Sequence, residues 1–69
     1  MKYAVLIERT STGYSGYVPD LPGVGVTGKT RPEVRRLLRE AVAIYIAEKR
    51  AQGARPPRST TVTEYVEAA

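Results

Sequence analysis

Residues 23–33 read GVGVTGKTRPE, and this stretch predicts where a β-strand ends and a helix begins. Val24 and Val26 alternate with other residues, which is the pattern of a strand with one buried face. Gly23 and Gly28 stand at the two ends of this strand, where glycine permits backbone dihedrals that other residues avoid. The stretch therefore predicts a strand, a tight turn and the start of a helix.

A long helix over residues 30–52 is the clearest element of the sequence. Thr30 and Glu33 form the Thr-x-x-Glu capping box of a helix N-terminus. Pro32 falls in the first turn, where its missing N–H costs little. Gly53 is placed to close the C-terminal end.

Apolar residues recur along this helix at the spacing of one buried face. The predicted inward stripe consists of Val34, Leu37, Leu38, Ala41, Ile44 and Tyr45. Val42 and Ile46 lie on its flank and widen the apolar arc to roughly 200°, more than packing on one sheet requires. We expect these two residues to contact another copy of the chain; the alternative is a helix that sinks deeply against its own sheet.

Two further strands are predicted before residue 19. Residues 2–8 and 14–18 alternate β-favouring side chains, and the turn at residues 9–13 joins them into an antiparallel hairpin. Pro19 and Pro22 then interrupt regular pairing, because proline has no N–H to donate.

After the helix, residues 54–59 form a proline-rich extended connector, and residues 60–66 return to strand-type alternation. The predicted order is β-β-β-α-β. We therefore expect residues 1–69 to be one two-layer α+β domain, with an antiparallel sheet covered on one face by a long helix.

Residues 23–30 also fit the letters of a nucleotide-binding P-loop. A P-loop follows a buried parallel strand and works with an aspartate on another strand that holds magnesium. Asp20, the only aspartate in the chain, precedes the glycines in the same loop, and only one helix is predicted. The sequence thus argues against nucleotide binding.

Composition limits the other functions. The 69 residues contain no cysteine and no histidine, which removes disulfides and the usual zinc ligands. With so few acids and no histidine base, neither a metal-binding carboxylate cluster nor a catalytic triad is expected. We predict a protein without enzymatic activity, cofactor or metal. The apolar run at the N-terminus is too short for a signal peptide, so a cytoplasmic location is expected.

The formal charge of +4 makes acidic partners and nucleic acid worth testing. Eight of the eleven basic residues are arginine, and asparagine is absent along with cysteine, a composition typical of thermophilic proteins.

The central part of the chain resembles the HicB-like antitoxin family. The residues that carry this resemblance are Gly16, Tyr17, the run VPDLPG at 18–23, Gly28, Thr30, Glu33, Glu40, Ala41 and Tyr45. The resemblance implies a partial RNase H-like fold that binds and masks a small basic ribonuclease toxin of the HicA type. Many members carry a C-terminal DNA-binding domain; this chain is expected to be a stand-alone member that does not bind DNA directly.

The loop residues Pro19, Asp20, Leu21 and Pro22 are the predicted partner-binding site. Asp20 is an isolated acid that could pair with a cationic toxin surface. The alternative is that Asp20 sets a turn by bonding its own backbone.

A second hypothesis is RNA binding by an arginine-rich helix face formed by Arg35, Arg39 and Arg50. These residues share one solvent-facing sector and could track phosphates. The alternative is a solvated surface, because glutamates interleave along the same helix and can pair with arginines three or four positions away.

Overall fold

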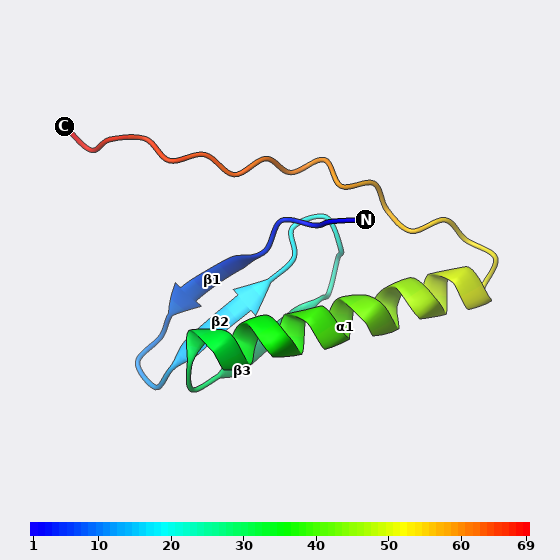
Figure 1. The fold of residues 1–69 in the computed structure, drawn as a ribbon, viewed down its shortest axis with the longest axis horizontal. Helices are drawn as coiled ribbons and strands as arrows, with labels where there is room; N and C mark the ends of the chain where they lie inside the picture. The colour runs from blue at the N-terminus through cyan, green and yellow to red at the C-terminus, as the bar shows by residue number, and fades with distance from the viewer.

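The computed structural model describes residues 1–69 and contains four regular elements: β1 (Leu6–Arg9), β2 (Tyr14–Tyr17), β3 (Gly25–Gly28) and α1 (Arg31–Ala51). The strands form one antiparallel sheet in the order β1-β2-β3. Helix α1 lies across one face of this sheet, as Figure 1 shows. The predicted α+β class with one long helix is therefore confirmed.

The register of the sheet fixes which side chains meet α1. Ile7 of β1 and Val26 of β3 both lie opposite Gly16 of β2. Because neighbouring residues across a sheet share a face, all three point towards the helix. The β1–β2 turn is closed by the Thr10 N–H, which donates to the Gly13 carbonyl at 2.8 Å.

The N-terminus of α1 is capped as the sequence predicts, with one difference. The Thr30 hydroxyl oxygen accepts from the Glu33 N–H at 3.2 Å. The Glu33 carboxylate accepts from the N–H of Lys29, at 2.6 Å, and not from that of Thr30. Gly28 allows this approach, since a Cβ there would lie 2.7 Å from the Glu33 carboxylate.

Two glycines have backbone angles that other residues adopt at a cost. Gly53 has φ of 75° directly after the helix, and its N–H donates to the Arg50 carbonyl at 3.0 Å. Gly23 has φ of 83° in the loop between β2 and β3. Both glycines perform the turn and cap functions predicted for them.

The core is small and lies between the sheet and the first half of α1. Its buried residues are Val18, Leu21, Val34 and Leu38. The helix approaches the sheet closely at Gly16, where an added Cβ would lie 2.7 Å from Val34 Cγ1 and 2.8 Å from Leu38 Cδ1.

The buried face of α1 differs from the predicted stripe at one position. Ile44 is 61% exposed, so its inward placement was wrong. Val42, predicted on the flank, packs against the core together with Tyr45. Relative to Leu38, Val42 is rotated by about 40° around the helix and Ile44 by about 120°. The sheet covers the part of the helix surface that includes Leu38 and Val42 but does not reach Ile44, which stays exposed to solvent.

The predicted strand at residues 60–66 is not formed: no strand follows α1. Residues 54–69, which we call the tail, run back past the sheet as an extended segment that leaves the body of the domain (Figure 1). The prediction was wrong because strand-type residues form a strand only where another strand pairs with them, and here none does.

Helix α1 is not apolar enough along its length to cross a membrane.

Candidate partner-binding surfaces

The loop between β2 and β3 is a compact turn held by its own backbone. The Val18 N–H donates to the Val24 carbonyl at 3.2 Å, and the Leu21 N–H donates to the Val18 carbonyl at 3.1 Å. Leu21 is 1% exposed and belongs to the core. Its side chain thus anchors the loop and is not available to a partner. An apolar residue between two prolines was the signal in the sequence for this buried anchor.

Asp20 holds the tail. Its carboxylate accepts from the N–H of Thr60 at 2.9 Å and from that of Thr61 at 3.0 Å. The hydroxyls of the same two threonines donate to it at 3.2 and 2.7 Å. The hydrogen bond from the Thr61 N–H is the main reason that the pKa of Asp20 is lowered from its usual value. The alternative that Asp20 bonds its own loop backbone was therefore wrong, because its four hydrogen bonds go to residues forty positions away.

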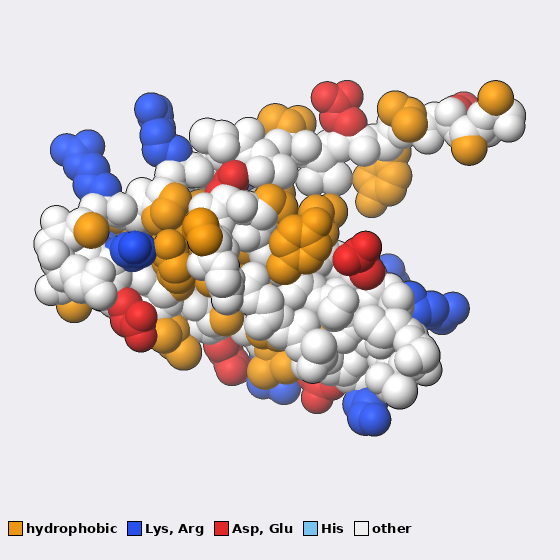
Figure 2. Space-filling view, turned by 180° about the vertical axis from the view of Figure 1, so that it is seen from behind, with side chains coloured by type: hydrophobic (Ala, Val, Ile, Leu, Met, Phe, Trp, Pro, Cys, Tyr) orange, Lys and Arg blue, Asp and Glu red, His pale blue; other side chains and the backbone are white.

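The exposed surface of this loop is apolar. Pro19 and Pro22 line a shallow depression together with Tyr17 and Val24. Tyr17 is 44% exposed and belongs to the sheet face opposite α1. Figure 2 looks at the molecule from that side and shows apolar patches beside broad areas of polar side chains and backbone. The loop and the adjoining Tyr17 thus offer a surface on which another protein could dock.

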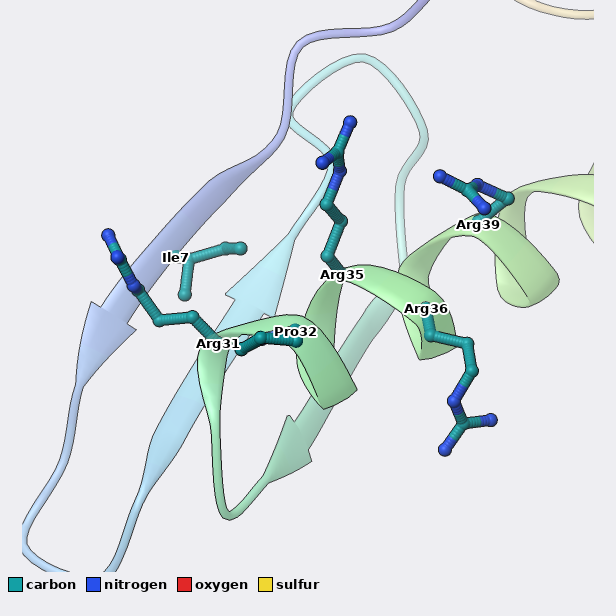
Figure 3. Close-up of a pocket in the computed structure, with 6 residues that line it drawn as sticks. All are labelled: Ile7, Arg31, Pro32, Arg35, Arg36 and Arg39. Carbon is teal, nitrogen blue, oxygen red and sulfur yellow. The ribbon is translucent and has the colours of Figure 1, made fainter.

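A second surface is the groove between β1 and α1. Arginines of the first three turns of the helix surround it, and its volume is about 550 Å³. Its lining residues are Ile7, Arg31, Pro32, Arg35, Arg36 and Arg39. In Figure 3, Arg31, Arg35 and Arg39 extend towards the side of β1, whereas Arg36 points the other way.

Three of the four arginines that line this groove carry uncompensated charge. The single ion pair of the structure joins Arg36 to Glu40 at 3.1 Å, on the other side of the helix. Arg31, Arg35 and Arg39 form no ion pair. The glutamates that interleave along α1 therefore do not neutralise this face.

The groove continues along α1 over an apolar floor. Tyr3, Val5 and Val42 line this part together with Leu38. Ile46 lies in the next recess, where Val42 again contributes to the lining. The oligomer contact predicted for Val42 and Ile46 stays a prediction, but the structure places both at the far end of the groove.

The residues of the RNA hypothesis do not form one cluster. Arg35 and Arg39 share the groove beside β1, whereas Arg50 lines the separate recess near the end of α1. RNA binding by these three residues stays a prediction.

The chain belongs to the HicB-like antitoxin family. Residues 3–69 match the family described as a HicB-like antitoxin of a bacterial toxin–antitoxin system. The match includes the hairpin, the proline-bounded loop, α1 and the tail, so the resemblance expected from the sequence is confirmed.

Three proteins of known sequence show the same relationship. A 14.9 kDa protein from the rep-hol intergenic region of Haemophilus phage HP1 is 30% identical over 66 residues, which are 96% of this chain and 50% of that protein. A UPF0150 protein of Thermoplasma acidophilum is 37% identical over 84% of this chain and 86% of its own length. Another UPF0150 protein, from Archaeoglobus fulgidus, is 35% identical over 72% of this chain and 74% of its own length. The archaeal relatives fit the thermophile-like composition.

A solved structure shares the fold. A chain of the HicA3 and HicB3 toxin–antitoxin complex superposes with a TM-score of 0.65 and is 31% identical in sequence. The similarity includes 80% of this chain and 64% of that one. The chain thus spans half of the phage protein and about two thirds of this structural relative.

Proposed function

We propose that this protein is an antitoxin that binds a HicA-type ribonuclease toxin and covers its catalytic surface. The observation that carries the proposal is the family match over residues 3–69. The likeness to a chain of a solved toxin–antitoxin complex supports it. In this role the protein is non-catalytic and acts in the cytoplasm, where a ribonuclease toxin meets its RNA.

The toxin contact is the surface formed by Tyr17, Pro19 and Pro22. Tyr17 is an exposed aromatic residue beside a rigid loop, and such residues contribute strongly to binding when a partner covers them. The loop is held in one conformation by the buried Leu21 and by its backbone hydrogen bonds. A preorganised surface loses little entropy on binding. Asp20 contributes by holding the tail beside this surface.

Neutralisation in a bacterial host tests the proposal. Each HicA-type toxin gene of the same genome is expressed with and without this protein, and growth is measured. We expect one of these toxins to arrest growth alone and to be neutralised when the antitoxin is present. Failure to neutralise any of them, with the protein folded and expressed, would contradict the antitoxin role.

A matched pair of variants tests the contact surface. In Tyr17→Ala, we expect the dissociation constant for the purified toxin to rise by about tenfold or more, because truncation of an interface aromatic typically has this effect. Ile44→Ala is the control, since Ile44 is also exposed and apolar but lies on α1. If the two variants bind the toxin with equal affinity, the toxin contact does not include Tyr17 and lies elsewhere than on this face of the sheet.

A further inference from the structure

The sheet has two free outer edges, those of β1 and β3, and one strand-like segment of the chain pairs with neither. Strand β1 pairs only with β2, so its outer edge is free. Residues 62–67 of the tail are extended and rich in β-favouring residues, yet Val62 is 77% and Tyr65 is 96% exposed. Free strand edges and exposed apolar strands both favour pairing with another chain. Each chain thus offers an unpaired extended segment and free strand edges, and the groove beside β1 distinguishes that edge from the edge of β3.

The tail is held where it leaves the domain but is free beyond that point. The Tyr3 hydroxyl donates to the Pro57 carbonyl, and Asp20 fixes Thr60 and Thr61. After Thr61 no hydrogen bond joins the tail to the body. Figure 1 shows the tail leaving the end of α1, passing the N-terminus and then diverging from β1. The free edge of β1 is therefore not filled by the tail of its own chain.

The groove beside β1 has the chemistry to receive this segment. In an extended chain, Val62, Glu64 and Val66 share one face. The groove has an apolar floor beneath a rim of unpaired arginines, among them Arg35 and Arg39. Val62 and Val66 suit the apolar floor, and the carboxylate of Glu64 between them suits the arginines.

The lengths also match. Six residues of strand span about 20 Å at roughly 3.3 Å per residue. The strand side of the groove is lined by residues that precede β1, from Met1 to Val5, and by Ile7 within it, which together are a comparable length of chain. A strand in this place would add a fourth strand to the sheet and cover the groove between β1 and α1.

We propose that residues 62–67 of one copy pair with the outer edge of β1 in a second copy, with Glu64 placed among Arg31, Arg35 and Arg39 of that copy. The exchange is reciprocal, so a symmetric dimer contains two such contacts. Val62 and Val66 lie on the apolar floor, where Val42 contributes to the contact. The inference concerns self-association and does not depend on toxin binding.

Charge reversal in the full-length chain tests the proposal by sedimentation velocity across a concentration series. We expect the wild type to be dimeric. Glu64→Arg and, separately, Arg35→Glu should each raise the dimer dissociation constant by about tenfold or more, because each places like charges together in a partly desolvated contact.

Mixing the two variants distinguishes exchange between copies from pairing within one chain. In a mixed dimer, the reversed tail meets the reversed groove, and the native Glu64 meets the native Arg35. Both contacts are then complementary, so equimolar mixing should restore association. A tail that folds onto its own β1 cannot be rescued in this way.

Two control variants are available in the same elements. Glu67→Arg changes a carboxylate on the opposite face of the extended segment, and Arg36→Glu changes the arginine that points away from the groove. Both should leave the dissociation constant within about threefold of the wild type, as expected for exposed charges.

Four results would overturn the proposal. A monomeric wild type excludes the exchange, and a dimer that resists both reversals uses another surface. Failure of the mixed variants to associate assigns the tail to its own chain. If the wild type does not self-associate but retains RNA, and Arg35→Glu abolishes that retention, the groove binds nucleic acid instead. Toxin neutralisation is measured separately, so its outcome does not decide this one.

Discussion

The body of the domain and its tail are ordered by different physical means. In residues 6–51, the strands pair with one another, the helix bonds its own backbone, and together they enclose an apolar core. No backbone–backbone hydrogen bond involves residues 55–69. The tail is held by one tyrosine hydroxyl and by the carboxylate of Asp20.

This difference shows what sets the shape of a small domain. Burial of apolar surface stabilises the whole body of the domain, because every core residue contacts several others. A side chain that accepts hydrogen bonds acts on one point of the chain only. Substitutions in the core should therefore change the stability of the whole body, whereas substitutions at the anchor should change only the tail.

The largest effect is expected for Leu38→Ala. Leu38 is fully buried on the face of α1 that packs against the sheet, and its truncation should lower the free energy of unfolding by about 2–5 kcal/mol, through lost burial and the cavity left behind. Ile44→Ala, on the exposed part of the same helix, should cost less than about 1 kcal/mol. Urea unfolding of both variants at one protein concentration measures the difference. A similar cost at both positions would mean that Ile44 is buried in solution.

A smaller loss is expected for Gly16→Ala. The added methyl group would lie within 3 Å of side-chain atoms of Val34 and Leu38, and overpacking of this kind costs about 1–3 kcal/mol. The thermal midpoint should fall by several degrees. Gly25→Ala is the control, because its Cβ would meet its nearest neighbour at 3.4 Å on the uncovered face. Equal midpoints would show that α1 can move away from the sheet without cost.

Asp20→Ala should release the tail and leave the body folded. The four hydrogen bonds to Thr60 and Thr61 are lost, whereas the buried Leu21 still anchors the loop. We expect the amide hydrogens of these threonines to exchange faster, with little change in the amides of α1. Hydrogen exchange followed by NMR measures both. Unchanged exchange at Thr60 and Thr61 would show that another contact holds the tail.

The smallest effect is the pH dependence of the same anchor. Hydrogen bonds from Thr61 and Thr60 lower the pKa of Asp20 in the folded protein below its usual 3.8. Folding therefore favours the ionised form, and this contribution to stability is present above pH 3.8 and is lost as the pH falls through the lower, folded value. Exchange at Thr61 should rise faster on acidification in the wild type than in Asp20→Ala, after correction for intrinsic rates. Parallel profiles would contradict this role of the carboxylate.

Much of the body could be predicted from the sequence because its signals are local. The helix start follows from Thr30 and Glu33, and its end from Gly53. The hairpin follows from alternation on both sides of a turn. The VPDLPG run and the glycine–threonine cap indicated the family, which the comparison confirmed.

The predictions that failed concern contacts between distant residues. The segment at 60–66 has the composition of a strand, but pairing depends on a free edge within reach. Ile44 lies on the apolar arc of α1, but the width of the sheet decides which part of that arc is buried. Asp20 could have bonded its own loop, and only the path of the tail brings Thr60 and Thr61 to it.

The sequence by itself determined the order of the elements, both ends of the helix and the α+β class, because caps, glycine turns and periodicity act within a few residues. The tertiary structure alone decided that Leu21 is buried, that Asp20 anchors the tail and that three arginines face a free strand edge without ion pairs. These features depend on contacts between residues that are far apart in the sequence. Such contacts form only when the chain folds, so local sequence patterns do not predict them.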